Sequence, residues 1–201
     1  MQILHPFEGS VHQYAAAIAD VDRYRPDHCP QCAAAQPLRG HGCYRRTLVD
    51  RGFDGIIRVR RYLCCYCKRT VSLLPVFALP WLRFGLTVIA LFLRARLLQQ
   101  LTLVAAAQAA GQPTMPYQRG QAWIRRFRRQ ARTLGLALAA LVRPQPTADG
   151  VTGALAGLEA VGWIPAHRFL FGELRAHLLG WPASLAPQGR RVMLDPAPLV
   201  P

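Results

Sequence analysis

The clearest polar and apolar pattern lies in residues 56–63, where apolar side chains alternate with arginines. Alternation is typical of a half-buried strand, because successive side chains point to opposite faces of a sheet. The two predicted faces are Ile57, Val59 and Leu63 on one side and Arg58, Arg60 and Tyr62 on the other. A second β-favouring run covers 44–49, and residues 50–55 between the runs are rich in Gly and Asp. The pattern therefore predicts a β-hairpin.

After residue 80 the apolar spacing changes to that of helices. The stretch 86–100 is apolar on most sides and predicts a buried helix. Residues 102–111 predict a short helix, because Thr102 is a capping residue and a glycine ends the run. The basic stretch 117–129 has a core face with the i, i+3, i+4, i+7 spacing. That face consists of Gly120, Trp123, Ile124 and Phe127. Together these helices predict a helix-turn-helix at about 102–130.

These elements predict an α+β fold in four regions. The regions are an N-terminal segment (1–24) with room for one short helix, a small β region (25–75), a helical domain (80–143) and a tail (144–201). Residues 73–81 are apolar and contain prolines, so we expect a connector between the β region and the helices. The tail holds 8 Pro and 7 Gly, which predicts a linker and at most one short helix, around 169–179.

Neither a membrane span nor a secretion signal is expected. The longest strongly apolar runs, 84–93 and 133–142, are each ten residues long, whereas a spanning helix needs about 20. The first twenty residues contain Glu8 and Asp20 and lack a basic segment followed by an apolar core. We therefore expect a cytoplasmic protein.

Charge is distributed unevenly along the chain. The formal net charge is +15, and residues 1–143 hold 21 basic and 6 acidic side chains, against 4 and 4 in residues 144–201. Lys68 is the single lysine among the 25 basic residues. Arginine matches phosphates and guanine edges well, although a GC-rich genome also favours arginine over lysine. The segregation of the charge favours a nucleic-acid partner for the first two thirds of the chain.

Six cysteines fall within 39 residues, and four of them form two C-x-x-C pairs separated by 31 residues. The pairs are Cys29 with Cys32 and Cys64 with Cys67. Two such turns facing each other make a tetrahedral four-thiolate site, which predicts one structural zinc ion per chain in a zinc ribbon. A closed site of this kind contributes folding energy and leaves no open position for catalysis.

Three alternatives to zinc remain open for these cysteines: a disulfide framework, a redox-active C-x-x-C pair, and an iron site with the same four ligands. The absence of an export signal counts against the first, and the presence of two motifs without a βαβ pattern counts against the second. Of the two remaining cysteines, Cys65 lies inside the second pair, and Cys43 is expected to be a small buried apolar residue.

Candidate DNA contacts lie on the basic helix and on the predicted strand. Glutamine and arginine side chains read adenine and guanine edges, and arginines also neutralise phosphates. The candidates for base contacts are Gln118, Arg119, Gln121 and Arg125, and those for phosphate contacts are Arg126, Arg128 and Arg129. Arg58 and Arg60 are expected to contact the nucleic-acid backbone from the strand.

The two cysteine pairs, with the stretches 42–46 and 57–75, give the chain a resemblance to a bacterial pattern. Residues 25–130 resemble the zinc-ribbon region of insertion-sequence transposases, especially a related family of unknown function in which a helix-turn-helix follows the ribbon. The resemblance implies that the four cysteines bind metal and that the helix at 117–129 reads element DNA. The chain departs from that family at Ala33 and Lys68, where glycine usually follows each cysteine pair, and at Gly120, which costs ~1 kcal/mol in helix propensity.

The predicted function is that of a DNA-binding protein of mobile-element origin, acting in end recognition during transposition or as a transcriptional repressor. Residues 144–201 are too few for an RNase H-like catalytic domain, so we expect no enzymatic activity. The expected partners are double-stranded DNA and a separately encoded transposase, and the expected location is the nucleoid. Whether the chain forms a homodimer is left open. The alternative is an RNA-binding or ribosome-associated zinc-ribbon protein that stacks bases on Tyr44, Tyr62 and Tyr66.

Overall fold

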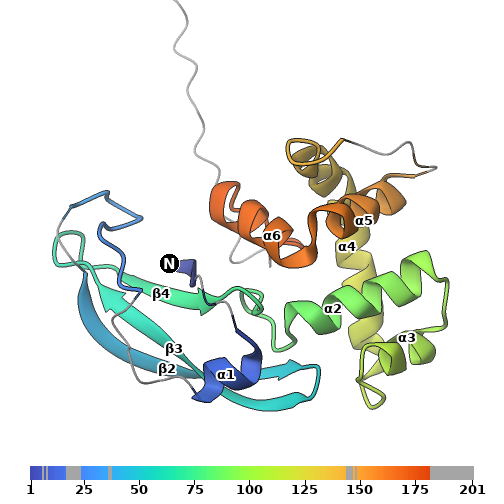
Figure 1. Ribbon diagram of the computed structural model, residues 1–201, viewed down its shortest axis with the longest axis horizontal. Helices are drawn as coiled ribbons and strands as arrows, with labels where there is room; N and C mark the ends of the chain where they lie inside the picture. The colour runs from blue at the N-terminus through green and yellow to red at the C-terminus, as the bar shows by residue number, and fades with distance from the viewer. Residues whose placement is uncertain are drawn as a thin grey trace, which may run out of the picture.

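The protein is seen in a computed structural model as a small β-sheet joined to a group of helices (Figure 1). The structure describes residues 1–5, 7, 9–16, 24–35, 38–143, 147 and 149–181. The fold is therefore α+β, as the sequence predicts.

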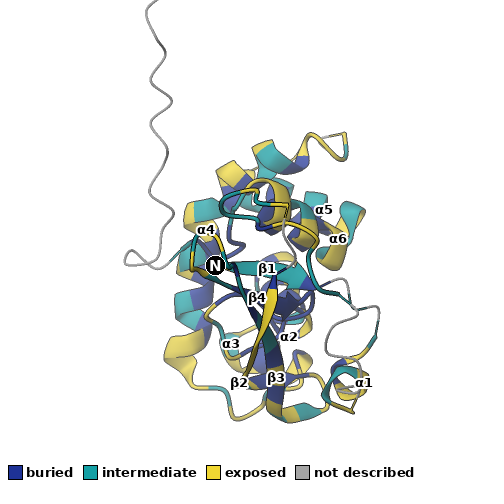
Figure 2. Ribbon diagram, turned by 90° about the vertical axis from the view of Figure 1, so that its left-hand side faces the viewer, coloured by how far each residue is buried: buried dark blue, intermediate teal, exposed yellow. Residues whose placement is uncertain are grey.

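Four strands form one sheet in the order β1, β4, β3, β2. Strands β2 (Arg39–Asp50) and β3 (Phe53–Leu63) pair antiparallel, and β4 (Thr70–Pro75) pairs antiparallel with β3. Strand β1 (Gln2–His5) lies parallel to β4 at the opposite edge from β2. Gly52, with φ of 71°, turns the chain between β2 and β3. Figure 2 shows exposed residues in the first half of β2 and buried residues along β3.

The predicted connector at 73–81 is in part a strand. β4 includes residues 73–75, and five of its six residues are buried, so it has no alternating pattern by which to recognise it. The expected faces of β3 hold for Ile57 and Val59, which are buried, and for Arg58, which is exposed. The expectation is wrong for Tyr62, which is fully buried, because the first cysteine loop and Leu38 pack with it.

The helices form the second part of the molecule. In chain order they are α1 (Val11–Ala16), α2 (Leu86–Leu93), α3 (Leu103–Ala109), α4 (Tyr117–Leu138), α5 (Gly150–Val161) and α6 (Trp163–His167). Two π-helical segments, η1 (Arg94–Leu98) and η2 (Arg168–Glu173), continue α2 and α6. Helix α4 extends beyond the expected residue 129, because Leu134 and Leu138 continue its buried face.

Helix α2 provides the centre of the helical core. Phe92 on α2 contacts Trp123 on α4 edge to face, with ring centroids 5.4 Å apart. A Cβ atom at Gly120 would lie 2.7 Å from Cζ of Phe92, so glycine is what allows the two helices to approach this closely. The propensity cost of Gly120 is thereby offset by packing.

The expectation of a tail with at most one short helix is wrong. Asp149 caps the 12-residue helix α5, because its Oδ1 accepts hydrogen bonds from the backbone N–H groups of Val151 and Thr152. Leu155 and Leu158 of α5 are buried in the same core as α2 and α4. The glycines that indicated a linker permit close packing instead: a Cβ atom at Gly157 would lie 3.3 Å from Leu138. The last part of the predicted tail, residues 182–201, lies outside the described part of the chain.

The sheet and the helices are joined by hydrogen bonds to the connector. The Arg46 guanidinium donates to the backbone carbonyls of Leu79 and Leu82, and Gly85 N–H donates to the carbonyl of Val49 over 2.8 Å. From the C-terminal side, Nε2 of His177 lies 3.1 Å from the carbonyl oxygen of Pro80. Among the described helices, none is both long and apolar enough to cross a membrane.

Candidate metal centre and basic helix surface

The two C-x-x-C pairs form two turns with the same hydrogen-bond pattern. In the first turn, Ala33 N–H donates to the carbonyl of Cys29 over 2.8 Å, and Cys29 N–H donates to the carbonyl of Ala34 over 3.0 Å. In the second turn, which directly follows β3, the N–H of Lys68 donates to the carbonyl of Cys64 over 3.0 Å. The sequence produces two matching turns because it repeats the spacing of the cysteines.

Both turns place a non-glycine residue in the left-handed region directly after the second cysteine. The φ angles are 55° at Ala33 and 57° at Lys68. A side chain in this region costs roughly 1–2 kcal/mol, because its Cβ crowds the backbone carbonyl. The departure from glycine at these positions therefore leaves the turn geometry intact and adds strain to it.

The two turns bring four sulfur atoms together. The ligand atoms of Cys29, Cys32, Cys64 and Cys67 all lie within 4.8 Å of one another. Cys29 Sγ is 3.8 Å from Cys67 Sγ, and Cys32 Sγ is 3.7 Å from Cys64 Sγ. Tetrahedral zinc with bonds of about 2.3 Å requires sulfur atoms about 3.8 Å apart. The four cysteines therefore fit a metal ion such as zinc.

Backbone N–H groups point at two of these sulfur atoms. The N–H of Gln31 lies 3.5 Å from Cys29 Sγ, and the N–H of Cys67 lies 3.5 Å from Cys64 Sγ. The N–H groups of Cys67 and Tyr66 lower the pKa of the Cys64 thiol, because they stabilise its thiolate form. A thiolate is the form that binds metal.

The remaining cysteines take no part in the cluster. Cys43, expected to be buried, is exposed on β2, where the β2–β3 register shifts between Gly40 and Cys43. Cys29 and Cys64, by contrast, are 0% and 2% exposed and belong to a small core with Tyr62. The four-cysteine cluster is thus built into the packing of the sheet.

Most of the polar residues predicted on the basic helix are exposed. Those exposed on α4 are Gln118, Arg119, Arg125, Arg128 and Arg129, and Gln121 is half-buried. The Arg119 guanidinium also lies 5.8 Å from the ring centre of Phe84, which orients its side chain. The expected core face of the helix is confirmed, since Gly120, Trp123, Ile124 and Phe127 are all buried.

Arg126 is the exception, because it is half-buried and binds backbone carbonyls of the C-terminal segment. Its Nε donates to the carbonyl of Leu179 over 2.8 Å, and its Nη2 donates to the carbonyl of Gly180 over 2.5 Å. Burial lowers the pKa of Arg126, because it removes solvent from the charged form. Arg126 therefore holds the segment after η2 against α4. Its partners are 53 and 54 positions away in the chain, so local sequence patterns do not predict this contact.

The strand arginines lie apart from those of α4. Arg58 is exposed, whereas Arg60 is half-buried with its guanidinium 5.2 Å from the ring centre of Tyr62. Figure 1 shows the sheet beyond the start of α2 and α4 crossing behind α2. The three tyrosines of the RNA-binding alternative do not form one surface, because Tyr62 is fully buried and Tyr66 is 76% exposed.

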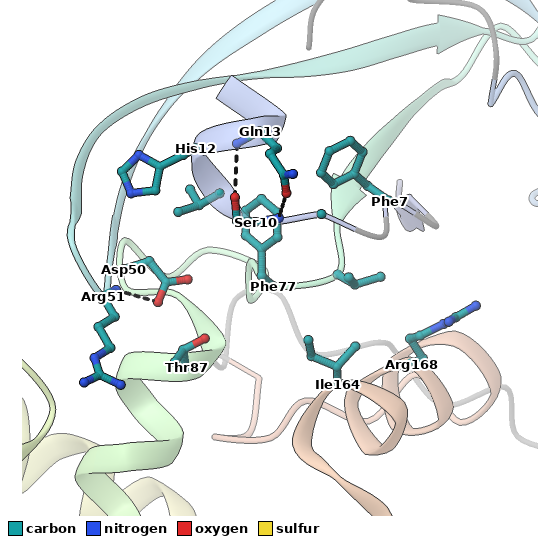
Figure 3. A pocket seen from close by; sticks show the side chains of 13 residues that line it. Phe7, Ser10, His12, Gln13, Asp50, Arg51, Phe77, Thr87, Ile164 and Arg168 are labelled. Carbon is teal, nitrogen blue, oxygen red and sulfur yellow. Dashed lines mark hydrogen bonds between the residues drawn. The ribbon is translucent and has the colours of Figure 1, made fainter. Parts of the chain in front are cut away.

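A cavity of 480 Å³ beside the β2–β3 turn was not predicted (Figure 3). The carboxylate of Asp50 lies in its wall, is 5% exposed and accepts a hydrogen bond from Arg51 N–H over 2.8 Å. Burial raises the pKa of Asp50. A Cβ atom at Gly85 would lie 2.5 Å from Asp50 Oδ2, so this carboxylate sits directly against the start of α2. Asp50 is thereby a contact between the sheet and α2.

These features define an α+β protein with a four-cysteine cluster beside its sheet and a basic outer helix. Residues 29–115 match a domain of unknown function (DUF6431). The match includes both cysteine pairs and ends before α4 begins. No curated protein and no solved structure matches the chain.

Proposed function

We propose that the chain binds double-stranded DNA through the outward face of α4. Four exposed residues carry this proposal, and they are spaced seven, four and three positions apart, which places them on one face of the helix. They are Gln118, Arg125, Arg129 and Arg132. Helix α4 has six arginines and no carboxylate among its 22 residues. At 1.5 Å per residue it is about 33 Å long, close to one turn of duplex DNA.

The arrangement of α3 before α4 supports a helix-turn-helix role. Thr102 caps α3 through a 3.1 Å hydrogen bond from Ala105 N–H, and Gly111, with φ of 72°, ends it. Ala106 and Ala110 are fully buried, which holds α3 close to the core and leaves α4 on the outside. The connection between the helices, residues 110–116, is longer than the roughly three to four residues of the compact motif.

We infer that the four cysteines hold one structural zinc ion per chain. The distances between the sulfur atoms fit tetrahedral zinc, and the two most buried ligands belong to the core beneath the sheet. When bound, the ion would cross-link the segment before β2 to the end of β3. Its binding free energy would add to the folding free energy, because the unfolded chain has no preformed site. Because four thiolates fill the coordination shell, the proposed role is structural.

The biological setting we propose is a mobile element. The resemblance to transposase-associated ribbon proteins supports a role in end recognition for a separately encoded transposase, or in repression at the promoter of the element. Nucleoid association in the cytoplasm would follow from DNA binding.

The test measures binding of a labelled random duplex by fluorescence anisotropy between about 50 and 200 mM salt. The variant combines Arg125→Gln, Arg129→Gln and Arg132→Gln. Each lost phosphate contact lowers the slope of log K against log salt by about 0.9, so we expect a slope smaller by about 2 to 3. Arg94→Gln is the matched control, because Arg94 is exposed and lies 3.8 Å from Glu159, on η1 rather than on α4.

Equal slopes in the triple variant and the unmodified protein would contradict the assignment of α4. A higher affinity for single-stranded RNA than for duplex DNA would instead favour the RNA-binding alternative. The first result would mean that another surface of the chain binds the duplex. The second would mean that the basic residues bind RNA.

A further inference from the structure

A second cavity lies where the C-terminal segment meets the edge of the sheet. Its volume is 480 Å³, and its wall includes Trp81, Phe171, Arg175 and Trp181. It contains neither a metal ligand nor a residue of the outward face of α4. We refer to the cavity lined by these four residues as the aromatic cavity.

The aromatic cavity has a rigid wall and one open ring. Trp81 and Trp181 meet edge to face with centroids 5.0 Å apart, and Phe171 lies 5.9 Å from Trp181. The indole N–H of Trp181 donates to the carbonyl of Arg175 over 2.8 Å, which fixes that ring. Trp81 is 46% exposed, so a flat ligand can reach its ring from solvent.

The backbone of this cavity is strained. Trp81 and Arg175 have φ angles of 55° and 52°, in the left-handed region that side chains rarely adopt. Of the five such non-glycine residues in the described part of the chain, two others are Ala33 and Lys68 in the metal-binding turns. Strain of this kind persists where the surrounding structure holds it, and it gathers at binding sites.

The charge around the aromatic cavity is positive. The Arg175 guanidinium lies 5.7 Å from the ring centre of Phe171. One of its nitrogens, Nη1, donates to the carbonyl of Gln2 over 3.2 Å, and its other nitrogens make no hydrogen bond or ion pair within 4 Å to a described carboxylate. A neighbouring hollow of 760 Å³ is lined by Lys68 and Arg69, and both hollows share Met1 in their walls. Cations therefore follow a path from the second cysteine turn to the open ring of Trp81.

We propose that the aromatic cavity binds single-stranded nucleic acid, with one unstacked base on the face of Trp81. Arg175 contacts the phosphate of that nucleotide, and Lys68 and Arg69 contact phosphates further along the strand. Aromatic platforms beside a cationic path are the common means of binding single strands without sequence preference. The net charge of +15 favours this polyanion over a peptide. The site extends the proposed DNA-binding function, because it would hold a base released from a duplex end, but it lies apart from α4.

The test compares single-strand binding by variants at Trp81. Trp81→Asn removes the ring, and asparagine tolerates the left-handed backbone, so the fold is expected to survive. Trp81→Tyr keeps an aromatic face. We expect Trp81→Asn to weaken binding of a labelled thymidine octanucleotide by about ten- to a hundredfold, the range for loss of one stacked base, and Trp81→Tyr to retain most of the affinity.

Two further probes separate stacking from charge. An abasic octanucleotide carries the same phosphates without bases, so it is expected to bind the unmodified protein as weakly as the thymidine strand binds Trp81→Asn. Arg129→Gln on α4 is expected to weaken duplex binding and leave single-strand binding unchanged. Thermal melting of each variant checks that the fold is kept.

The inference is overturned if Trp81→Asn binds the thymidine strand like the unmodified protein, or if the abasic strand binds equally well. Either result can occur while α4 variants still lower duplex affinity, so this failure is distinct from failure of the proposed DNA-binding function. A loss of single-strand binding in Trp81→Tyr as large as in Trp81→Asn would also overturn it, because an aromatic face would then not be what binds.

Discussion

Replacing Ala33 and Lys68 by glycine is expected to stabilise the two cysteine turns. Both residues have positive φ angles, of 55° and 57°, and both donate their N–H to the carbonyl of the first cysteine of the pair. Glycine keeps this hydrogen bond and removes the Cβ that crowds the backbone. The change therefore relieves strain without removing a contact that the fold requires.

The magnitude follows from two opposing effects. A side chain in the left-handed region costs roughly 1–2 kcal/mol, which glycine recovers. Glycine also makes the unfolded chain more flexible, which lowers stability by about 0.4–1 kcal/mol. We expect a net gain of about 0.5–1 kcal/mol at each position in the free energy of unfolding.

The assay is urea unfolding of zinc-loaded protein, followed by circular dichroism, together with a chelator competition for zinc. Ala34→Gly is the matched control, because Ala34 is the next residue and is not among those with positive φ. The control is expected to lose stability, since it gains only flexibility in the unfolded chain. If Ala33→Gly and Ala34→Gly lose stability equally, the turn geometry described for the cysteine pairs is wrong.

Two other predictions concern the metal and the pH dependence. Cys32→Ser is expected to abolish stoichiometric zinc binding in mass spectrometry and to unfold the sheet. Cys43→Ser alters an exposed thiol outside the cluster, so it is expected to keep the zinc and the folded sheet. Zinc retention by Cys32→Ser would refute the site. Burial lowers the pKa of His167 to about 3 and that of His177 to about 4. As the pH falls below about 6.5, these histidines take up protons in the unfolded chain but stay neutral in the folded one. The free energy of unfolding therefore falls by roughly 1.4 kcal/mol per pH unit for each histidine until the pH reaches its folded-state pKa. Urea unfolding of His177→Gln between pH 7 and 5 should show a shallower loss than the unmodified protein, and an equal loss would contradict this account.

The features predicted correctly from the sequence are those that depend on the spacing of neighbouring residues. The cysteine pairs are three residues apart and each forms its own turn, so their sequence signature survives without knowledge of the fold. The buried face of α4 follows from the 3.6-residue period, and Thr102 and Gly111 cap and end α3 where expected. These features depend on residues close together in the chain.

The features that could not be predicted depend on residues far apart. β1 pairs with β4 across about seventy positions, with Gln2 opposite Ser72, and both strands lack an alternating pattern. Arg126 resembled a phosphate ligand because the carbonyls of Leu179 and Gly180 that bind it are distant in sequence. The glycines of α5 indicated a linker because only the packed structure shows Gly157 against Leu138.

The order of the elements shows how the cysteine cluster is connected to the proposed duplex surface. β3 ends at the second cysteine turn, β4 begins directly after it, and the connector that follows β4 supplies the carbonyls that bind Arg46 and lie against His177. β4 and this connector are therefore the stretch of chain that links the cysteine cluster to the helices. Helix α4 itself is held by the separate core around Phe92 and by Arg126, so its outward face depends on the metal only indirectly. Loss of the metal is accordingly expected to loosen the core around Cys29 and Cys64, while the shape of the α4 surface is set by the helical core.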